Sequence, residues 1–336
     1  MHRLLRGDVD RLLCRDSAGR VLIPTRESAI GHLATAVNLR NAVTVSQDRL
    51  GTRVGSLNEN REMPPPRFSL ERQILRYYES GQEAERLESP FSRWEKVRTL
   101  DLLDRFLPRA PALILDVGGA AGAYAFPLAQ AGYVVDLIDP VPLHIEQAKQ
   151  RAARGQRVPR NFQVGDARAI PCDDASADAV LFFGPLYHLT DSNERLKAIC
   201  EARRVLRAGG VLLAVAISRF ASALDGIARG FISDPDFVRI VKQDLTTGQH
   251  RNETGNLDYF TTAFFHHPDE LKTELIEGGF PNPRLCAIEG PLWTIPESVT
   301  AEQQEKLMAT VRALESEVTL MGASAHIMAI ATKPND

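Results

Sequence analysis

Residues 112–122 read Ala-Leu-Ile-Leu-Asp-Val-Gly-Gly-Ala-Ala-Gly. The first six residues form a short apolar run that is typical of a buried strand. The glycines that follow predict a tight strand-to-helix turn, because glycine adopts backbone angles that other residues avoid and lets a ligand approach the backbone closely. We therefore expect a strand, a turn and a helix in this order, which is the first unit of an α/β fold.

The same alternation continues along the chain. Further short apolar runs follow this unit, and most of them are separated by helical patterns. Buried strands that alternate with helices indicate a mostly parallel sheet with helices on both faces. The predicted strands are 112–117, 133–138, 161–164, 179–183, 210–217, 285–288 and 326–331, and the predicted helices of this part are 122–131, 143–154, 193–207, 268–277 and 300–317.

Three segments differ from this alternation. Residues 67–108 carry apolar side chains at three- and four-residue steps, so we interpret them as an N-terminal helical cover before the main domain at 109–333. Residues 218–266 show short helical patterns and no predicted strand, and we interpret them as a lid inserted after the fifth strand. Residues 1–66 contain no aromatic residue and end in three prolines, so we expect a weakly ordered extension there.

The composition narrows the class of protein. The 336 residues are 44% hydrophobic and 25% charged, which is the balance of a globular chain. The net charge of −3 gives no electrostatic reason to expect binding to nucleic acid or to an anionic membrane. The four cysteines lie far apart, and the sequence shows neither a signal peptide nor an 18-residue apolar run. We therefore expect a cytoplasmic protein, and a homodimer is compatible with the sequence.

Acidic residues mark the ends of the first three strands. Asp116 lies in the first strand, Asp139 ends the second, and Asp166 follows the third. Because the carboxyl ends of parallel strands meet at one edge of a sheet, these carboxylates should gather there. A carboxylate at Asp139 can bridge the two hydroxyls of a ribose, and one at Asp166 can accept a hydrogen bond from the amine of adenine. The pattern suits a ligand that contains adenosine.

Together these motifs resemble the class I S-adenosylmethionine-dependent methyltransferases, which share Asp-x-Gly-x-x-x-Gly after the first strand. The likeness covers residues 68–333 and is greatest with the small-molecule branch, type 11, related to ubiquinone and menaquinone biosynthesis. It implies a Rossmann-like, seven-stranded sheet with a final antiparallel strand, S-adenosyl-L-methionine as cofactor, and methyl transfer to a small molecule. The cofactor-binding residues that it implies are Asp116, Gly118, Gly119, Gly122, Asp139, Pro140, Asp166, Ala167, Arg168, Phe183, and, from the cover, Tyr78 and Arg86.

Two alternatives stay open at this point. A nicotinamide dehydrogenase also places a glycine-rich turn about twenty residues before an acidic residue. Its G-x-G-x-x-G pattern is broken here, because Ala120 stands where the second glycine is needed. The other alternative is a catalytically idle module that binds S-adenosylmethionine for regulation or complex formation. Pro127 lies inside the predicted helix 122–131, and we expect it to bend that helix.

The candidates for catalysis follow from the chemistry of methyl transfer, which needs a base only where the acceptor loses a proton. His188 and Tyr187 follow the fourth strand at the cofactor edge, so His188 is a candidate base, with a structural role in its loop as the alternative. His267 precedes a predicted helix, where capping is the alternative to a role in the pocket. A metal cluster of His250, His266 and His267 lacks a carboxylate at suitable spacing, so we expect no metal site.

Overall fold

The computed structural model describes residues 72–79, 92–294 and 299–335, so the predicted extension 1–66 and Arg86 lie outside it. Its strands are β1 (Leu113–Val117), β2 (Val134–Asp139), β3 (Asn161–Val164), β4 (Ala177–Phe182), β5 (Leu206–Ser218), β6 (Gln249–His250), β7 (Ala263–His266), β8 (Arg284–Ala287) and β9 (His326–Thr332). Its α-helices are α2 (Arg72–Glu79), α4 (Arg93–Phe106), α5 (Ala125–Gln130), α6 (Pro142–Ala152), α7 (Pro185–His188), α8 (Ser192–Val205), α9 (Ala221–Arg229), α10 (Pro235–Thr247), α11 (Pro268–Glu277) and α12 (Ala301–Leu314). Short 3₁₀ helices lie at η2 (Phe231–Ser233), η3 (Leu257–Tyr259), η4 (Gly290–Thr294) and η5 (Val318–Ala323).

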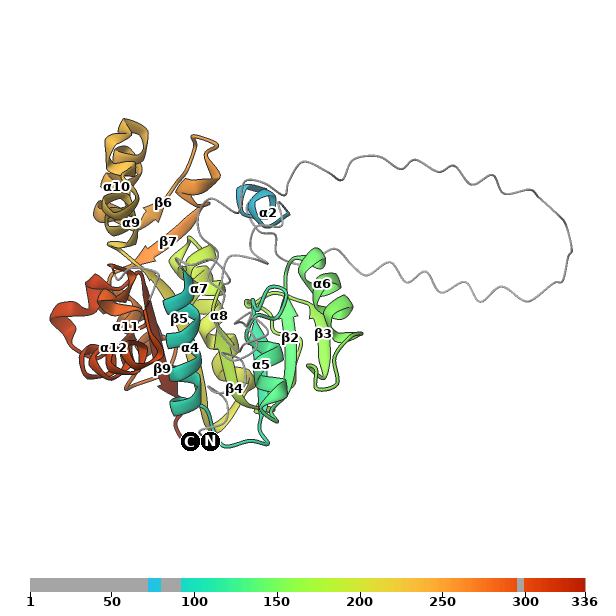
Figure 1. Ribbon diagram of the computed structural model, residues 1–336. Helices are drawn as coiled ribbons and strands as arrows, with labels where there is room; N and C mark the ends of the chain where they lie inside the picture. The colour runs from blue at the N-terminus through green and yellow to red at the C-terminus, as the bar shows by residue number, and fades with distance from the viewer. Residues whose placement is uncertain (1–71, 80–91, 295–298, 336) are drawn as a thin grey trace, which may run out of the picture. The chain divides into compact units, whose positions relative to one another are not determined.

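The strands form one twisted sheet whose main path runs β3-β2-β1-β4-β5-β7-β6 (Figure 1). The five strands from β3 to β5 are parallel to one another. Strand β9 is antiparallel to both β5 and β8, as the predicted final antiparallel strand requires. The predicted Rossmann-like, mostly parallel sheet is therefore confirmed.

The strand count differs from the prediction, because the described part of the sheet has nine strands where the sequence predicted seven. Both additional strands lie within the segment 218–266, which the sequence analysis interpreted as free of strands. Strand β7 extends the sheet by pairing in parallel with the end of β5, where Ile217 is opposite Phe265, and β6 pairs with β7. These strands have two and four residues, too short for their periodicity to stand out from that of the helices around them.

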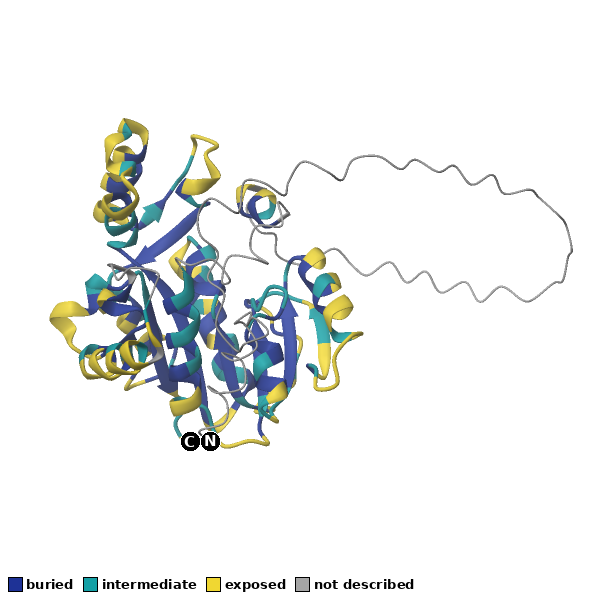
Figure 2. Ribbon diagram, viewed as in Figure 1, coloured by how far each residue is buried: buried dark blue, intermediate teal, exposed yellow. Residues whose placement is uncertain are grey.

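Two apolar layers enclose the sheet, because successive side chains of a strand point to opposite faces. Ile114 of β1 packs in a layer with α4, α5 and α6, and its neighbour Leu115 packs in the opposite layer with α8 and α11. Figure 2 shows the central strands as buried along their length. Among the described residues, no helix is both long and apolar enough to cross a membrane.

Helix α5 begins later than predicted, and this explains how the chain accommodates Pro127. The helix starts at Ala125, so Pro127 occupies its first turn, where a missing backbone N–H breaks no bond inside the helix. The Ala131 N–H still donates to the Pro127 carbonyl at 2.9 Å. The expected bend therefore has no cause here, because residues 120–124 form a turn instead of the first turn of the helix.

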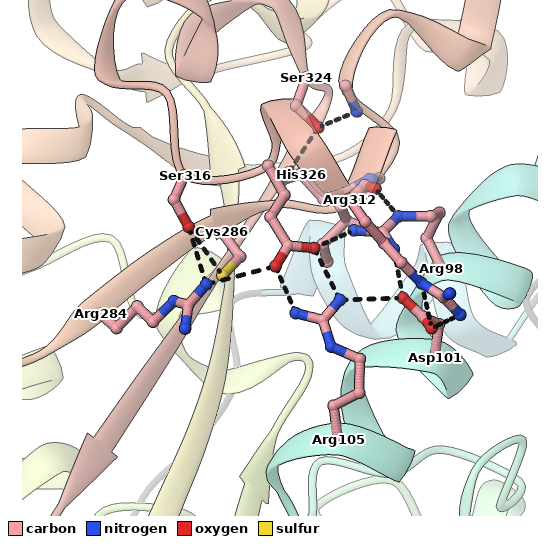
Figure 3. A network of polar contacts seen from close by, with 12 residues as sticks. Arg98, Asp101, Arg105, Arg284, Cys286, Arg312, Ser316, Ser324 and His326 are labelled. Atoms are coloured by element: carbon pink, nitrogen blue, oxygen red, sulfur yellow. Dashed lines mark hydrogen bonds and ion pairs between the residues drawn. The ribbon is translucent and has the colours of Figure 1, made fainter. Parts of the chain in front are cut away.

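Helix α4 buries a polar face. Arg98 is fully buried, and its guanidinium contacts Asp101 and, at 2.8 Å, Glu315 near the C-terminal end of α12. Its Nε also donates to the Ile288 carbonyl after β8, at 2.9 Å. Figure 3 shows Arg98, Asp101 and Arg312 together on one side of this ion-pair network, and Arg284 on the opposite side near Cys286 and Ser316. The network ties α4 to the C-terminal part of the sheet.

Candidate functional site

A cavity opens at the carboxyl ends of the central strands, which is where ligands bind in open α/β sheets. Segments that are distant in the sequence meet around it: the turn after β1, the end of β2, the segment after β4, and side chains from α2, α4 and the start of β9. Its lining includes Tyr78, Glu95, Thr99, Gly118, Gly119, Asp139, His144, Asp166, Phe183, Tyr187, His188 and His326.

The glycine-rich turn forms the floor of the cavity. Gly118 has a φ of +74°, and a Cβ atom there would lie 2.8 Å from Cδ of Pro185. A Cβ on Gly119 would lie 2.5 Å from Cγ of Asp116, so this position has no room for a side chain. Gly122 also has a positive φ, of +85°, but does not line the cavity. The turn therefore exposes backbone to the cavity, as its sequence predicted.

Asp139 lies at the cavity wall, where β2 ends. Its Oδ2 accepts a hydrogen bond from the Ala120 N–H at 2.8 Å, and its Oδ1 accepts one from the Val141 N–H at 2.9 Å. Nδ1 of His144, in the first turn of α6, also lies 2.9 Å from Oδ1. The carboxylate is thus fixed against the glycine turn, and Oδ2 keeps lone-pair capacity for a hydroxyl donor in the cavity.

Asp116 lies beneath the turn, outside the cavity lining. It is fully buried, and its carboxylate oxygens have no hydrogen-bond partner within normal geometry. Burial and then the negative charge of Asp139 raise the pKa of Asp116 to about 7, although the nearby Ala125 amide favours the charged form. A carboxyl group with this pKa carries its proton for much of the time near neutral pH.

Asp166 and Ala167 line the cavity, whereas Arg168 is not part of its lining. The Arg168 guanidinium binds both oxygens of Asp166, at 2.8 and 2.7 Å, and donates to Glu194 at 2.9 Å. Arg168 therefore holds the Asp166 carboxylate in one orientation at the cavity edge, and it touches the site through Asp166.

Aromatic and imidazole rings form part of the cavity lining. The Tyr78 hydroxyl, from α2, forms a short hydrogen bond with Nε2 of His188 at the end of α7. The Tyr78 ring also makes edge-to-face contacts with His144 and His188, both with ring centroids 5.2 Å apart. The Tyr187 hydroxyl donates to the Phe183 carbonyl at 2.5 Å, which fixes the segment after β4. Tyr78 of α2 thus lines the cavity together with these rings.

The structure places the other histidine candidates outside the cavity lining. His267 is the N-cap of α11, its ring accepts from the Asp269 N–H, and its side chain is 46% exposed. Nδ1 of His250 lies 2.9 Å from Asp244, and its Nε2 lies 2.8 Å from the Tyr259 carbonyl, so both ring nitrogens are engaged. Buried His266 contacts Glu274 at 3.2 Å, and burial lowers the pKa of its imidazole. His267 thus has the capping role that the sequence analysis gave as its alternative.

The cavity is also lined by residues that no sequence motif indicated. His144 follows Asp139 by five residues in the first turn of a predicted helix, so its proximity to a β2 carboxylate was readable from the sequence. Glu95, Thr99 and His326 gave no such signal, because they reach the cavity from segments far along the chain. Only the three-dimensional arrangement brings them together.

Comparisons with known proteins agree with this geometry. Residues 114–210 match the sequence profile of a family described as a methyltransferase domain. An uncharacterized methyltransferase of Mycobacterium tuberculosis is 38% identical over 112 residues, which are 33% of this chain and 42% of that protein. A ubiquinone biosynthesis O-methyltransferase of Methylocella silvestris is 34% identical over 129 residues, which are 37% of this chain and 49% of that protein. The chain thus spans less than half the length of these curated relatives.

The fold has solved counterparts as well. The crystal structure of an S-adenosylmethionine-dependent methyltransferase from Thermotoga maritima, described as a possible histamine N-methyltransferase, superposes with a TM-score of 0.51. The two sequences are 18% identical, and the alignment covers 78% of this chain and 99% of that one, so the likeness concerns the fold. The matched profile shows a methyltransferase domain at residues 114–210, and the sheet order and the glycine turn agree with the class I S-adenosylmethionine-dependent type.

Proposed function

We propose that this chain transfers the methyl group of S-adenosylmethionine to a small molecule that binds in the cavity beside it. One observation carries the proposal: the glycine turn and Asp139 share a single cavity with Tyr187 and His188. The glycine turn and Asp139 suit a nucleoside cofactor, and Tyr187 and His188 suit an acceptor. Methyl transfer is a displacement that requires donor and acceptor to be aligned in one site from which water is excluded.

The residues at the cofactor end fit S-adenosylmethionine. Gly118 and Gly119 line the cavity without a side chain, so a ligand can lie directly against their backbone. The Asp139 carboxylate is positioned to accept from ribose hydroxyls, and the Asp166 carboxylate from the adenine amine. When bound, S-adenosylmethionine supplies a methyl group on a positively charged sulfur. Tyr78 would then cover the bound cofactor from the side of α2.

At the acceptor end, His188 is our candidate for the group that receives a proton. Its Nε2 contacts the Tyr78 hydroxyl, so a proton taken from an acceptor hydroxyl could be shared across this pair. Tyr187, fixed through Phe183, shapes the wall beside it. We place His188 and Tyr187 at the acceptor end, and we give His267 no part in the reaction because it caps α11 outside the cavity.

We propose an aromatic or quinol-like small molecule as the acceptor. Phe183, Tyr124, Val215 and Ile288 give the cavity apolar walls, and polar side chains occupy only parts of it. The relative from Methylocella silvestris, named for ubiquinone biosynthesis, points to the same class of substrate.

A labelled-methyl assay tests this function. The full chain is incubated with S-adenosylmethionine carrying a tritiated methyl group, together with a panel of substituted phenols, catechols, short-chain quinols and primary amines. We expect labelled product from at least one hydroxyl-bearing or quinol acceptor, with a rate that falls at least about tenfold in His188→Asn, the size of effect expected for a proton-transfer group. Binding of S-adenosylhomocysteine with no product from any acceptor would instead favour the idle binding module.

A further inference from the structure

Phe260, the residue that follows the 3₁₀ helix η3, has a strained backbone. Its φ is +66° and its ψ is −172°, a combination that is essentially confined to glycine because a side chain clashes with the backbone there. Such a conformation persists only where the surrounding structure holds it, and strained residues are concentrated at active sites and ligand clamps. The strain at Phe260 therefore points to a function for this position.

Hydrogen bonds hold Phe260 in this conformation. The side-chain amide of Asn252 donates to the Phe260 carbonyl at 2.7 Å, and the Phe260 N–H donates to the Leu257 carbonyl at 3.2 Å. On the preceding residue, the Tyr259 carbonyl lies 2.8 Å from Nε2 of the buried His250. Both polar backbone groups of Phe260 and the carbonyl before it are thus engaged, and relaxation of the turn would break these bonds.

The ring of Phe260 lies between α2 and the segment after β4. Its centroid is 5.4 Å from the ring centroid of Tyr77 on α2, in an edge-to-face contact, and 6.2 Å from that of His188. The side chain also packs against two buried apolar clusters, one that contains Tyr77 and Tyr78 and one that contains Tyr187. Phe260 thus joins α2 to the segment that carries Tyr187 and His188.

Helix α2 needs contacts of this kind because it is short. It has eight residues, too few for a stable isolated helix in water. Its Tyr78 lines the cavity, and its Gln73 accepts a hydrogen bond from Thr262, two residues after Phe260. The chain around Phe260 therefore holds α2 at two places, through the Phe260 ring and through the Thr262 hydroxyl.

We propose that Phe260 is a positioning residue that holds α2, and with it Tyr78, against the cavity. Release of bound S-adenosylhomocysteine then requires the contact between Phe260 and α2 to open, because movement of a covering element sets the rate of product release in many enzymes. Relief of the backbone strain on opening offsets part of the lost ring contacts, so the contact stays reversible. The positioning of α2 is independent of the proposed function, and the effect on product release rests on that function.

Hydrogen exchange measured by mass spectrometry tests the positioning of α2 without any ligand. In the wild-type full chain we expect the α2 amides to exchange at least about tenfold more slowly than in an unstructured peptide of the same sequence. Phe260→Ala should remove most of this protection. The matched control is Phe220→Ala, which truncates another half-buried ring of the segment 218–266, one that contacts His267, and it should leave the exchange of α2 unchanged.

Surface plasmon resonance on the immobilised full chain then measures the dissociation of S-adenosylhomocysteine. We expect the dissociation rate constant to rise at least about tenfold in Phe260→Ala. Phe260→Tyr, which keeps the ring, and the control Phe220→Ala should stay within about threefold of the wild type.

Urea unfolding of Phe260→Gly and Phe260→Ala tests the strain. Both variants lack the ring, but glycine adopts this backbone conformation without a steric clash. The unfolding equilibrium constant of Phe260→Gly should therefore be about tenfold lower than that of Phe260→Ala. A glycine variant no more stable than the alanine variant would overturn the strained backbone on which the proposal rests.

The remaining outcomes separate this proposal from the proposed function. An unprotected α2 in the wild type, unchanged exchange in Phe260→Ala, or an equal increase in Phe220→Ala overturns the positioning role. Faster exchange of α2 with unchanged dissociation of S-adenosylhomocysteine overturns the part in product release. If the wild type binds no S-adenosylhomocysteine, the proposed function is contradicted, and the exchange of α2 still decides the positioning role.

Discussion

The Tyr78 hydroxyl hydrogen-bonds to Nε2 of His188, although the two residues are 110 positions apart in the sequence. This contact joins α2 to the cavity at the edge of the sheet, which both residues line. A second contact fastens the same helix, because the Thr262 hydroxyl donates to Gln73 at 2.5 Å. The cover and the insertion after β5 are thus linked to each other above the cofactor edge.

The position of Tyr78 predicts that its ring covers the cofactor. Tyr78→Ala removes the edge-to-face contacts with His144 and His188, so we expect the affinity for S-adenosylhomocysteine to fall by about tenfold. Tyr78→Phe keeps the ring and should stay within about threefold of the wild type. Calorimetry on both variants measures the difference. Equal losses in the two variants would assign the effect to the hydroxyl instead of the ring.

The buried Asp116 predicts a pH-dependent stability. Its pKa of about 7 lies above the ordinary value of 3.8, so the folded state takes up a proton at a higher pH than the unfolded state does. The carboxylate therefore lowers stability above pH 7, and this loss disappears as the pH falls from about 7 towards 4. Asp116→Asn should stabilise the protein at pH 8, by up to about 4 kcal/mol, and should have little such effect at pH 4.

Urea unfolding of the wild type and Asp116→Asn at pH 8 and at pH 4 to 5 checks this prediction. The control is Asp136→Asn, because Asp136 pairs with Arg160 away from the cavity and that variant should lose stability. A stabilisation by Asp116→Asn that is the same at both pH values would show that the titration of Asp116 is not its cause.

Gly118 of the turn after β1 can be compared with Gly132, a second glycine with a positive φ. Gly118 and Gly132 both have positive φ, but a Cβ on Gly118 would lie 2.8 Å from Pro185, whereas a Cβ on Gly132 meets no atom within 4 Å. Gly132→Ala should lose about 1 kcal/mol from backbone strain alone. Gly118→Ala should lose about 3 kcal/mol, because the steric clash adds to that strain, and should also lose S-adenosylhomocysteine binding. Similar losses in the two variants would mean that the turn can relax away from Pro185.

The ion-pair network of α4 predicts that removing the Arg98 side chain destabilises the protein strongly. Arg98→Ala removes a fully buried guanidinium from Asp101 and Glu315, so we expect the free energy of unfolding to fall by about 3 kcal/mol. Lys306→Ala breaks an exposed pair with Glu302 and should change stability by less than about 0.5 kcal/mol. Chemical denaturation of both variants makes the comparison. A small effect of Arg98→Ala would show that Arg105 and Arg312 compensate both acids.

Much of the sheet and of the cofactor end was predictable because those signals are local. The apolar runs located β1 to β5, β8 and β9 to within a few residues, and the glycines after β1 predicted the turn. Asp139 follows directly from a strand end, so its place at the cavity needed only the rule that parallel strands end at one edge. Tyr78 was expected only through the family resemblance.

The acceptor end was less predictable because its contacts are non-local. The apolar periodicity of α4 gives no sign that Arg98 and Thr99 are buried, as they are in the structure. The burial of Arg98 is explained by its ion pair with Glu315, which is 217 residues away in the sequence. Glu95 and His326 converge for the same reason, and no spacing rule in the sequence connects them.

Calorimetric titration with S-adenosylhomocysteine tests the central claim most directly. We expect saturable micromolar binding to the wild type and to Asp136→Asn, which makes the same change on β2 outside the cavity. In Asp139→Asn the affinity should fall by about tenfold or more, because hydrogen bonds to a charged carboxylate are lost. NADH should not bind. No binding of S-adenosylhomocysteine to the wild type, or binding of NADH in its place, would contradict the account.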